Sequence, residues 1–152
     1  MAQIELSLSG AFVPQARTPA EAEFVTNVER WTFTANAAME PCLVINASTE
    51  ILAVSPSCAD LFGLGKPEDV IGKQLSSALR LIDFTATAGE LDGNDVEMIP
   101  PLLAIRSERL ARGLLRVVPA PGEPPLTVDA VTTPLHDGDR VAGSLTFFSS
   151  VR

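Results

Sequence analysis

Residues 41–72 carry the pattern that most constrains the fold of this chain. Residues 42–45 (Cys-Leu-Val-Ile) and 51–54 (Ile-Leu-Ala-Val) are short apolar runs rich in β-branched side chains, which favour extended backbone. Between them, residues 46–50 (Asn-Ala-Ser-Thr-Glu) have the side chains that stabilise turns. Two short strands joined by five turn-forming residues predict a β-hairpin.

Two short helices are expected directly after this hairpin. Ser55 can accept a hydrogen bond from an amide at the start of the first helix, where Pro56 suits the first helical position. Gly63 can adopt the left-handed conformation that ends such a helix. Pro67 and Gly72 repeat this arrangement, so a second short helix should follow.

The last third of the chain alternates apolar runs with turn residues. Residues 114–118, 126–135 and 141–149 have strand-forming composition, and the proline-rich segment 119–125 and the turn 136–139 separate them. We expect three antiparallel strands that complete a sheet with the N-terminal hairpin.

The final predicted strand is apolar on both faces. One face would carry Ala142, Ser144, Thr146 and Phe148, and the other Val141, Leu145 and Phe147. A sheet that is apolar on both sides must be covered on both. We therefore expect a core or pocket on one side and an amphipathic helix on the other.

Taken in order, these motifs resemble a PAS domain. The similar segments are the hairpin, the Ser-Pro start and Leu-Phe-Gly end of the first helix, Pro-Glu-Asp-Val-Ile-Gly at 67–72, and LTVDAVTTPLHDGDRVAGSLTFF at 126–148. The resemblance covers residues 40–150. It implies an α+β fold with a five-stranded antiparallel sheet, short flanking helices on one face and an N-terminal amphipathic helix on the other.

Residues 18–39 are predicted to form that N-terminal helix, after an arm (1–17) that is ordered only if something holds it. Thr18, Pro19 and Glu21 form a helix start signal. The apolar residues that share one stripe are Phe24, Val28, Trp31, Ala35 and Ala38. This stripe can pack on its own domain, or it can pair with the same helix of a second chain and form a homodimer.

The middle of the chain, residues 73–112, carries weaker signals. Residues 74–82 are compatible with one or two helical turns, and residues 85–95 have the composition of a loop. The acidic cluster at 92–97 lacks the alternating oxygen ligands and closing glutamate of a calcium loop, so we expect a solvated loop.

A further helix is predicted over residues 102–112, ending at Gly113. Arg106, Arg109 and Arg112 recur every three residues and would share one side of it. They could bind an anionic ligand or partner. They could equally be solvated cations that complement the helix dipole near its C-terminus.

Charge and cysteine content exclude several classes of partner. The net charge of −8 opposes direct binding to nucleic acid or to anionic membranes. No apolar run is long enough to span a bilayer, and Cys42 and Cys58 lie among apolar neighbours, as buried thiols do in a reducing compartment. We expect a cytoplasmic protein of bacterial type.

The residues give little support for an enzyme or a metal site. His136, the single histidine, lies in a predicted turn, and the chain has no second histidine to pair with a nucleophile elsewhere. A glycine-rich phosphate loop and metal-spaced cysteines are missing too. Within the PAS resemblance, residues 102–112 have no histidine to bind haem, and Cys58 is not in the Asn-Cys-Arg-Phe motif of flavin photosensors. We therefore expect no cofactor.

The PAS resemblance instead implies a sensory and signal-transduction module with an aliphatic pocket, which suits a small apolar or amphipathic ligand. The candidate lining residues are Leu61, Leu79, Leu102, Leu103, Leu115, Thr132, Thr146 and Phe148. Family members usually continue from the last strand into a signalling helix, whereas residues 149–152 (Ser-Ser-Val-Arg) do not. Output is thus expected through dimer contacts or an effector protein such as a kinase or transcription regulator. A structural homodimerisation domain without a ligand is the alternative.

Overall fold

The computed structural model describes residues 26–151 and shows an α+β fold built on one antiparallel sheet. The strands are ordered β2-β1-β6-β5-β4-β3, so β6 lies between β1 and β5. Their bounds are β1 (Cys42–Asn46), β2 (Ile51–Val54), β3 (Leu81–Ile82), β4 (Ala111–Val117), β5 (Leu126–Asp137) and β6 (Arg140–Ser150). The α+β fold predicted from the sequence is confirmed, although the sheet has six strands instead of five.

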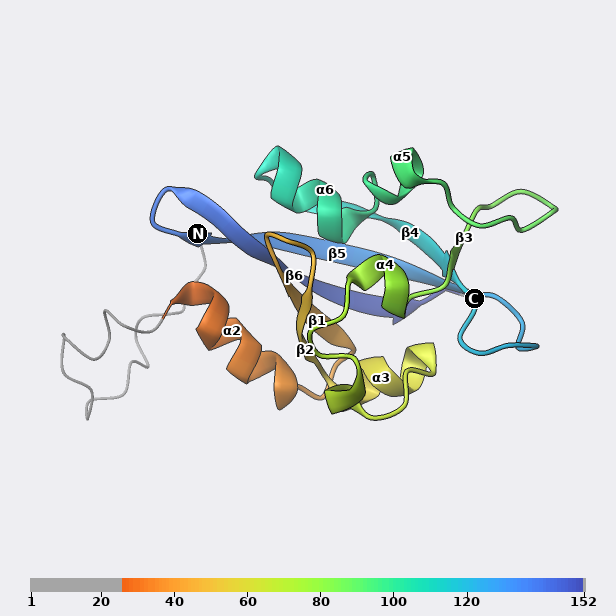
Figure 1. Cartoon of the computed structure of the whole chain (residues 1–152), viewed down its shortest axis with the longest axis horizontal. Helices are drawn as coiled ribbons and strands as arrows, with labels where there is room; N and C mark the ends of the chain where they lie inside the picture. The colour runs from red at the N-terminus through yellow and green to blue at the C-terminus, as the bar shows by residue number, and fades with distance from the viewer. Residues whose placement is uncertain (1–25, 152) are drawn as a thin grey trace.

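Helices cover both faces of the sheet (Figure 1). They are α2 (Asn27–Asn36), α3 (Pro56–Phe62), the 3-10 helix η2 (Pro67–Asp69), α4 (Leu75–Ala78), α5 (Gly93–Val96) and α6 (Pro100–Ser107). Helix α2 packs on β1, β2, β5 and β6 from one side, which we call the outer face. The other helices cover the opposite, inner face. Among residues 26–151, no helix is long and apolar enough to cross a bilayer.

Helix α2 differs from the predicted helix 18–39 at both ends. It begins after Thr26, an extended residue whose Oγ1 accepts a hydrogen bond from the Glu29 amide at 3.0 Å, and it ends at Asn36. The expected start at Thr18 and the arm 1–17 lie outside the described residues. The Asn27 amide donates to Asp137 Oδ1 at 2.8 Å, which ties the start of α2 to the end of the β5–β6 hairpin.

The predicted hairpin and the helix after it are present. Asn46 Oδ1 accepts hydrogen bonds from the amides of Ser48 and Glu50, which fixes the turn between β1 and β2. Ser55 Oγ accepts from the Cys58 amide at the start of α3, and Gly63 ends that helix at φ 63°. Both assignments follow from local side-chain chemistry, which is why the sequence predicted them.

Ser55 also joins three segments of the chain. It is fully buried, and besides capping α3 its Oγ accepts from the Cys42 amide at 3.0 Å and donates to the Glu40 carbonyl at 2.8 Å. One hydroxyl thus connects the segment before β1, the first residue of β1 and the start of α3.

Helix α6 ends earlier than predicted, so the prediction that three arginines share one side of it is wrong. Glu108 takes the left-handed conformation at φ 60° and stops the helix at Ser107, so β4 already begins at Ala111. Arg112 therefore lies on β4 instead of sharing a helix face with Arg106. The sequence did not show this end, because glutamate is seldom found in that conformation.

The sixth strand, β3, comes from the segment predicted to be helical at 74–82. Only Leu75–Ala78 is helical, and Leu81 and Ile82 then pair with Val117 and Arg116 of β4. A strand of two residues is too short to give a periodic pattern, so the sequence carries no signal for it.

Residue 143 allows β1 to lie beside β6. Gly143 is paired with Asn46, and a Cβ added at Gly143 would lie 2.2 Å from the Ile45 carbonyl oxygen. Only glycine can occupy this position without moving β1.

We predict that Ser55→Ala lowers the free energy of unfolding by about 3 kcal/mol, since it removes a helix cap and leaves buried backbone groups unpaired. Ser57→Ala is the matched control, because Ser57 is only partly buried: its hydroxyl donates to the Met39 carbonyl and lies 3.4 Å from Ser55 Oγ, but it makes none of the bonds of Ser55 to the Cys42 and Cys58 amides. Urea unfolding of both variants measures the difference. An equal loss in the two variants would contradict the role assigned to Ser55.

Candidate functional site

The predicted pocket residues lie on the inner face, where the structure brings most of them together. Leu79, Leu115 and Phe148 are buried in one apolar cluster, and Leu61 and Leu102 pack against its edge. Thr132 and Thr146 are fully buried on the neighbouring strands β5 and β6. Leu103, also on α6, is partly buried but is not part of this cluster.

Two threonine hydroxyls form the polar centre of this inner face. Thr132 and Thr146 are paired across β5 and β6, and their Oγ1 atoms are 2.8 Å apart. A hydroxyl pair shares one proton in its mutual hydrogen bond, so the second proton remains available to another acceptor. Nearby, Ser144 Oγ donates to the Pro101 carbonyl at 2.9 Å and holds the start of α6 against β6.

Aromatic packing closes the other end of the inner face. The rings of Phe62, on α3, and Phe148, on β6, meet edge to face with centroids 4.9 Å apart. Most of the predicted lining residues therefore lie within or against one apolar cluster in this structure.

Two open pockets lie elsewhere on the described surface. The first, which we call the edge groove, has a volume of about 200 Å³ and is lined by residues drawn from 81–91, 95–100 and 112–116. The second has a volume of about 280 Å³ and lies between residues 62–64, 70–80 and 118–121, where Lys73 and Arg80 contribute cations. Of the predicted pocket residues, Leu115 reaches the edge groove and none lines the second pocket.

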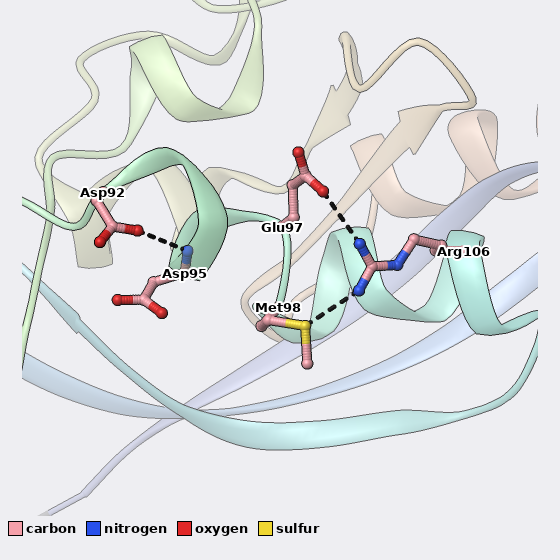
Figure 2. A network of polar contacts seen from close by, with 5 residues as sticks. All are labelled: Asp92, Asp95, Glu97, Met98 and Arg106. Carbon is pink, nitrogen blue, oxygen red and sulfur yellow. Dashed lines mark hydrogen bonds and ion pairs between the residues drawn. The ribbon is translucent and has the colours of Figure 1, made fainter.

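Hydrogen bonds between side chains and backbone of the α5–α6 region stabilise one wall of the edge groove (Figure 2). Arg106 of α6 reaches back to Glu97 Oε1 at 3.0 Å and to Met98 Sδ at 3.1 Å. The Asp92 carboxylate accepts from the Asp95 amide at 2.9 Å and caps α5. Asp92 therefore has a structural role, and within residues 26–151 no cluster of three metal-ligating side chains is present.

The opposite wall is β4, whose two arginines are already engaged. Arg112 pairs with Asp129 on β5 at 2.6 Å, and the hydrogen bond from Arg112 holds the pKa of the Asp129 carboxyl below its usual value. Arg116 donates to the Asp83 and Thr85 carbonyls. Hydrogen bonds from the Thr85 side chain and backbone lower the pKa of Asp83. The loop after β3 is thus tied to β4.

The predicted dimer stripe is divided between two environments. Val28 and Ala35 are buried against the outer face, and Ala38 packs at the edge of the same cluster. Trp31 is partly exposed beside them, whereas Phe33, on the opposite side of α2, is 80% exposed. Phe24 lies outside the described residues. The part of the stripe that is described mostly covers its own sheet.

Both thiols are buried, on opposite faces of the sheet. Cys42 packs in the outer cluster with α2, and Cys58 in the inner cluster. Burial raises the pKa of Cys58 to about 12, and the charge of Cys42 adds to the effect. Burial likewise raises the pKa of Cys42. His136 lies on β5 beside the turn, with its side chain exposed.

Comparison with known proteins gives a likeness of structure without a likeness of sequence. No protein-family model matches the chain, and no curated protein matches it either. Among solved structures, the PAS domain of a Colwellia psychrerythraea protein aligns with a TM-score of 0.57 at 12% identity, over 82% of this chain and 96% of that one.

Two further structures have named sensory roles. The VqmA dimer of Vibrio cholerae, described in connection with LuxR-type receptors, aligns with a TM-score of 0.57 at 15% identity. The alignment covers 82% of this chain and 51% of the VqmA chain, so this chain spans about half the length of VqmA. The LOV domain of the blue-light photoreceptor Aureochrome1 aligns with a TM-score of 0.56 at 15% identity, over 76% of this chain and 84% of that one. At these identities the likeness concerns the fold alone.

We predict that Cys58 resists alkylation in the folded protein. At pH 8 its labelling by iodoacetamide should be at least about a hundredfold slower than in urea, since the thiolate is the reactive form and an unperturbed thiol has a pKa near 8.5. In the folded state the rate should keep rising about tenfold per pH unit beyond pH 9, because the raised pKa leaves the thiol mostly protonated there. Peptide mapping by mass spectrometry measures both rates, and a plateau near pH 9 in the folded protein would contradict the assignment.

Proposed function

We propose that this chain, which has the fold of a PAS domain, is a sensory module that binds a small uncharged ligand on its inner face and signals through dimer or partner contacts. The observation that carries the proposal is the buried hydroxyl pair of Thr132 and Thr146 at the centre of an otherwise aliphatic and aromatic surface. Such a surface, with few polar groups, is typical of small-molecule sites.

The chemistry of the inner face supports a neutral ligand. Among residues 26–151 the buried polar side chains are serines and threonines and none is charged, so a charged ligand would lose its hydration without a buried counter-ion. A neutral molecule with one carbonyl or hydroxyl group could bond to the free proton of the threonine pair and bury its remaining surface against leucines and phenylalanines. We therefore assign a small neutral amphipathic ligand.

Ligand binding would select a conformation in which α6 lies farther from the sheet. The helix is only eight residues long and ends at the left-handed Glu108. In the closed state, its contacts include the hydrogen bond from Ser144 to the Pro101 carbonyl. A ligand that binds only the open state shifts the population by its affinity for that state.

Strand β6 offers a short path from the ligand to the outer face. Thr146 points to the inner face, and its neighbour Leu145 is buried under α2 with Val28 and Ala35. Movement of β6 at Thr146 therefore changes the surface on which α2 packs. Through α2, the signal would reach a second copy or an effector such as a kinase or transcription regulator.

The outward side of α2 is the proposed contact surface for a second copy. Phe33 lies on this side, Trp31 is exposed at the border with the sheet, and Met39 follows just beyond the helix; all three are large apolar side chains with exposed surface. VqmA, whose fold is similar, is described as a dimer. Clusters of exposed apolar side chains are typical of protein contacts.

A structural homodimerisation domain without a ligand is the second candidate. The observation in its favour is that the inner-face residues already fill the space between the sheet and the helices, with Thr132 and Thr146 fully buried. This candidate predicts the same α2 contact but no bound molecule.

Native mass spectrometry of freshly purified protein tests the ligand. We expect a retained small molecule in the wild-type chain and its loss in the double variant Thr132→Val/Thr146→Val, which keeps the side-chain shapes but removes both hydroxyls. Because both partners are replaced together, the free energy of unfolding should change by less than about 1 kcal/mol.

Thr133→Val is the control for this experiment, because Thr133 is exposed on the outer face of the same strand. It should retain the molecule. Persistent absence of a ligand from the wild-type protein, together with a tight dimer, would support the structural alternative.

Analytical ultracentrifugation tests the dimer surface. Phe33→Glu should shift the population from dimer to monomer while the melting temperature stays within about 2 °C, since an exposed substitution costs little folding energy. Ala35→Glu should instead lower the melting temperature, because Ala35 is only 1% exposed against the sheet. A Phe33→Glu protein that remains dimeric would exclude this surface.

A further inference from the structure

A sulfur atom at the edge groove lies against a positive charge. Met98 Sδ accepts a hydrogen bond from Arg106 Nη2 at 3.1 Å, and Arg106 Nη1 donates to Glu97 Oε1 at 3.0 Å (Figure 2). Met98 is 53% exposed and lines the edge groove. Solvent and small reagents can therefore reach a thioether that is already in contact with a guanidinium group.

The backbone holds these two side chains in place. The Met98 amide donates to the Asp95 carbonyl at 3.0 Å, and the next residue, Ile99, is buried in the inner cluster. The Ile99 carbonyl accepts from the Leu103 amide at 2.8 Å, at the start of α6. Arg106 lies in the last turn of the same helix. Main-chain hydrogen bonds and burial thus fix the positions from which Met98 and Arg106 meet.

A thioether is a weak partner for the Arg106 side chain. Methionine sulfur is a poor hydrogen-bond acceptor, whereas a guanidinium group is a permanently charged donor. The ion pair with Glu97 adds little stability, because its two side chains are 55% and 63% exposed. An oxygen atom in place of the sulfur lone pair would bond to Arg106 Nη2 much more strongly.

We propose that Met98 is a site of reversible oxidation and that Arg106 binds the oxygen of its sulfoxide. A lone pair of Sδ attacks the outer oxygen of a hydroperoxide, and the S–O bond forms as the O–O bond breaks. The sulfur loses two electrons, which the peroxide gains, and the peroxide proton passes to the leaving oxygen, which departs as water or an alcohol. Methionine sulfoxide reductases return the sulfoxide to the thioether.

The surroundings of Met98 allow the added oxygen to stay in the folded protein. In a packed core a sulfoxide is disruptive, because it places a polar group among apolar side chains. Met98 instead borders an open groove of about 200 Å³, and its three rotatable bonds let the oxygen turn toward Arg106. The sulfoxide then links the segment before α6 to the last turn of that helix by a charge-assisted hydrogen bond.

Met39 provides the comparison within the chain. It is the other methionine among residues 26–151, it is 88% exposed, and its sulfur has no hydrogen-bond donor in that part of the chain. Hydroperoxide should therefore oxidise both side chains, but only at Met98 should the new oxygen gain a bond in the folded state.

Oxidation with tert-butyl hydroperoxide, followed by peptide mapping and urea unfolding, tests the proposal without involving a ligand on the inner face. The parent is Met39→Leu, and adding Met98→Leu measures any contribution from Met1. In each protein we compare the folding equilibrium constant after oxidation with that before it. This ratio should be at least about fivefold higher in the parent than with Arg106→Leu added, since only the parent can form the charged hydrogen bond.

Arg109→Leu is the matched control, because it removes a nearby cation that makes no hydrogen bond to Met98 and should leave the ratio unchanged. The Arg106 side chain is 55% exposed, so its replacement should leave the chain folded. Equal ratios in the parent and the Arg106→Leu variant would overturn the proposal. So would an equal fall with Arg109→Leu, or a Met98 that stays reduced while Met39 of the wild-type chain is oxidised.

Discussion

The close approach of β1 to β6 is the constraint on which the rest of this structure depends. A side chain at residue 143 would collide with the Ile45 carbonyl, so glycine there lets the two strands pair. Because β6 also pairs with β5, this one contact joins the N-terminal hairpin and its capped helix to the C-terminal hairpin. Without it the sheet would separate into two halves, each with a new edge of unpaired backbone amides and carbonyls.

Sequence reasoning succeeded where the determinants of structure are local. The cap at Ser55, the left-handed Gly63 and the turn at Asn46 each follow from a few neighbouring residues, and the structure shows all three. It failed where tertiary packing imposes a conformation that the local sequence does not favour. Glu108 ends α6 in a conformation that its own side chain does not favour, and β3 exists only because β4 offers it an edge.

The candidate site, too, could be predicted from the sequence only in part. Alternation along β6 was sufficient to place Thr146 and Phe148 on the inner face, since the period of a strand leaves only two choices. The phase of α6 was harder: Leu102 packs against the inner cluster, whereas Leu103, about 100° further around the helix, lies apart from it. The edge groove had no signal in the sequence, because it arises where β3 stops short of β4's full length.

The strand order also has a consequence for synthesis on the ribosome. β1 is made early, and its four residues from Cys42 to Ile45 are buried on both faces of the finished sheet. Its neighbour β6 is the last strand to be translated, so the nascent chain must keep β1 unpaired on one side until nearly all of residues 26–151 have emerged. Pairing across so long a separation is slow, and unpaired apolar strands are prone to aggregate while they wait for their partner.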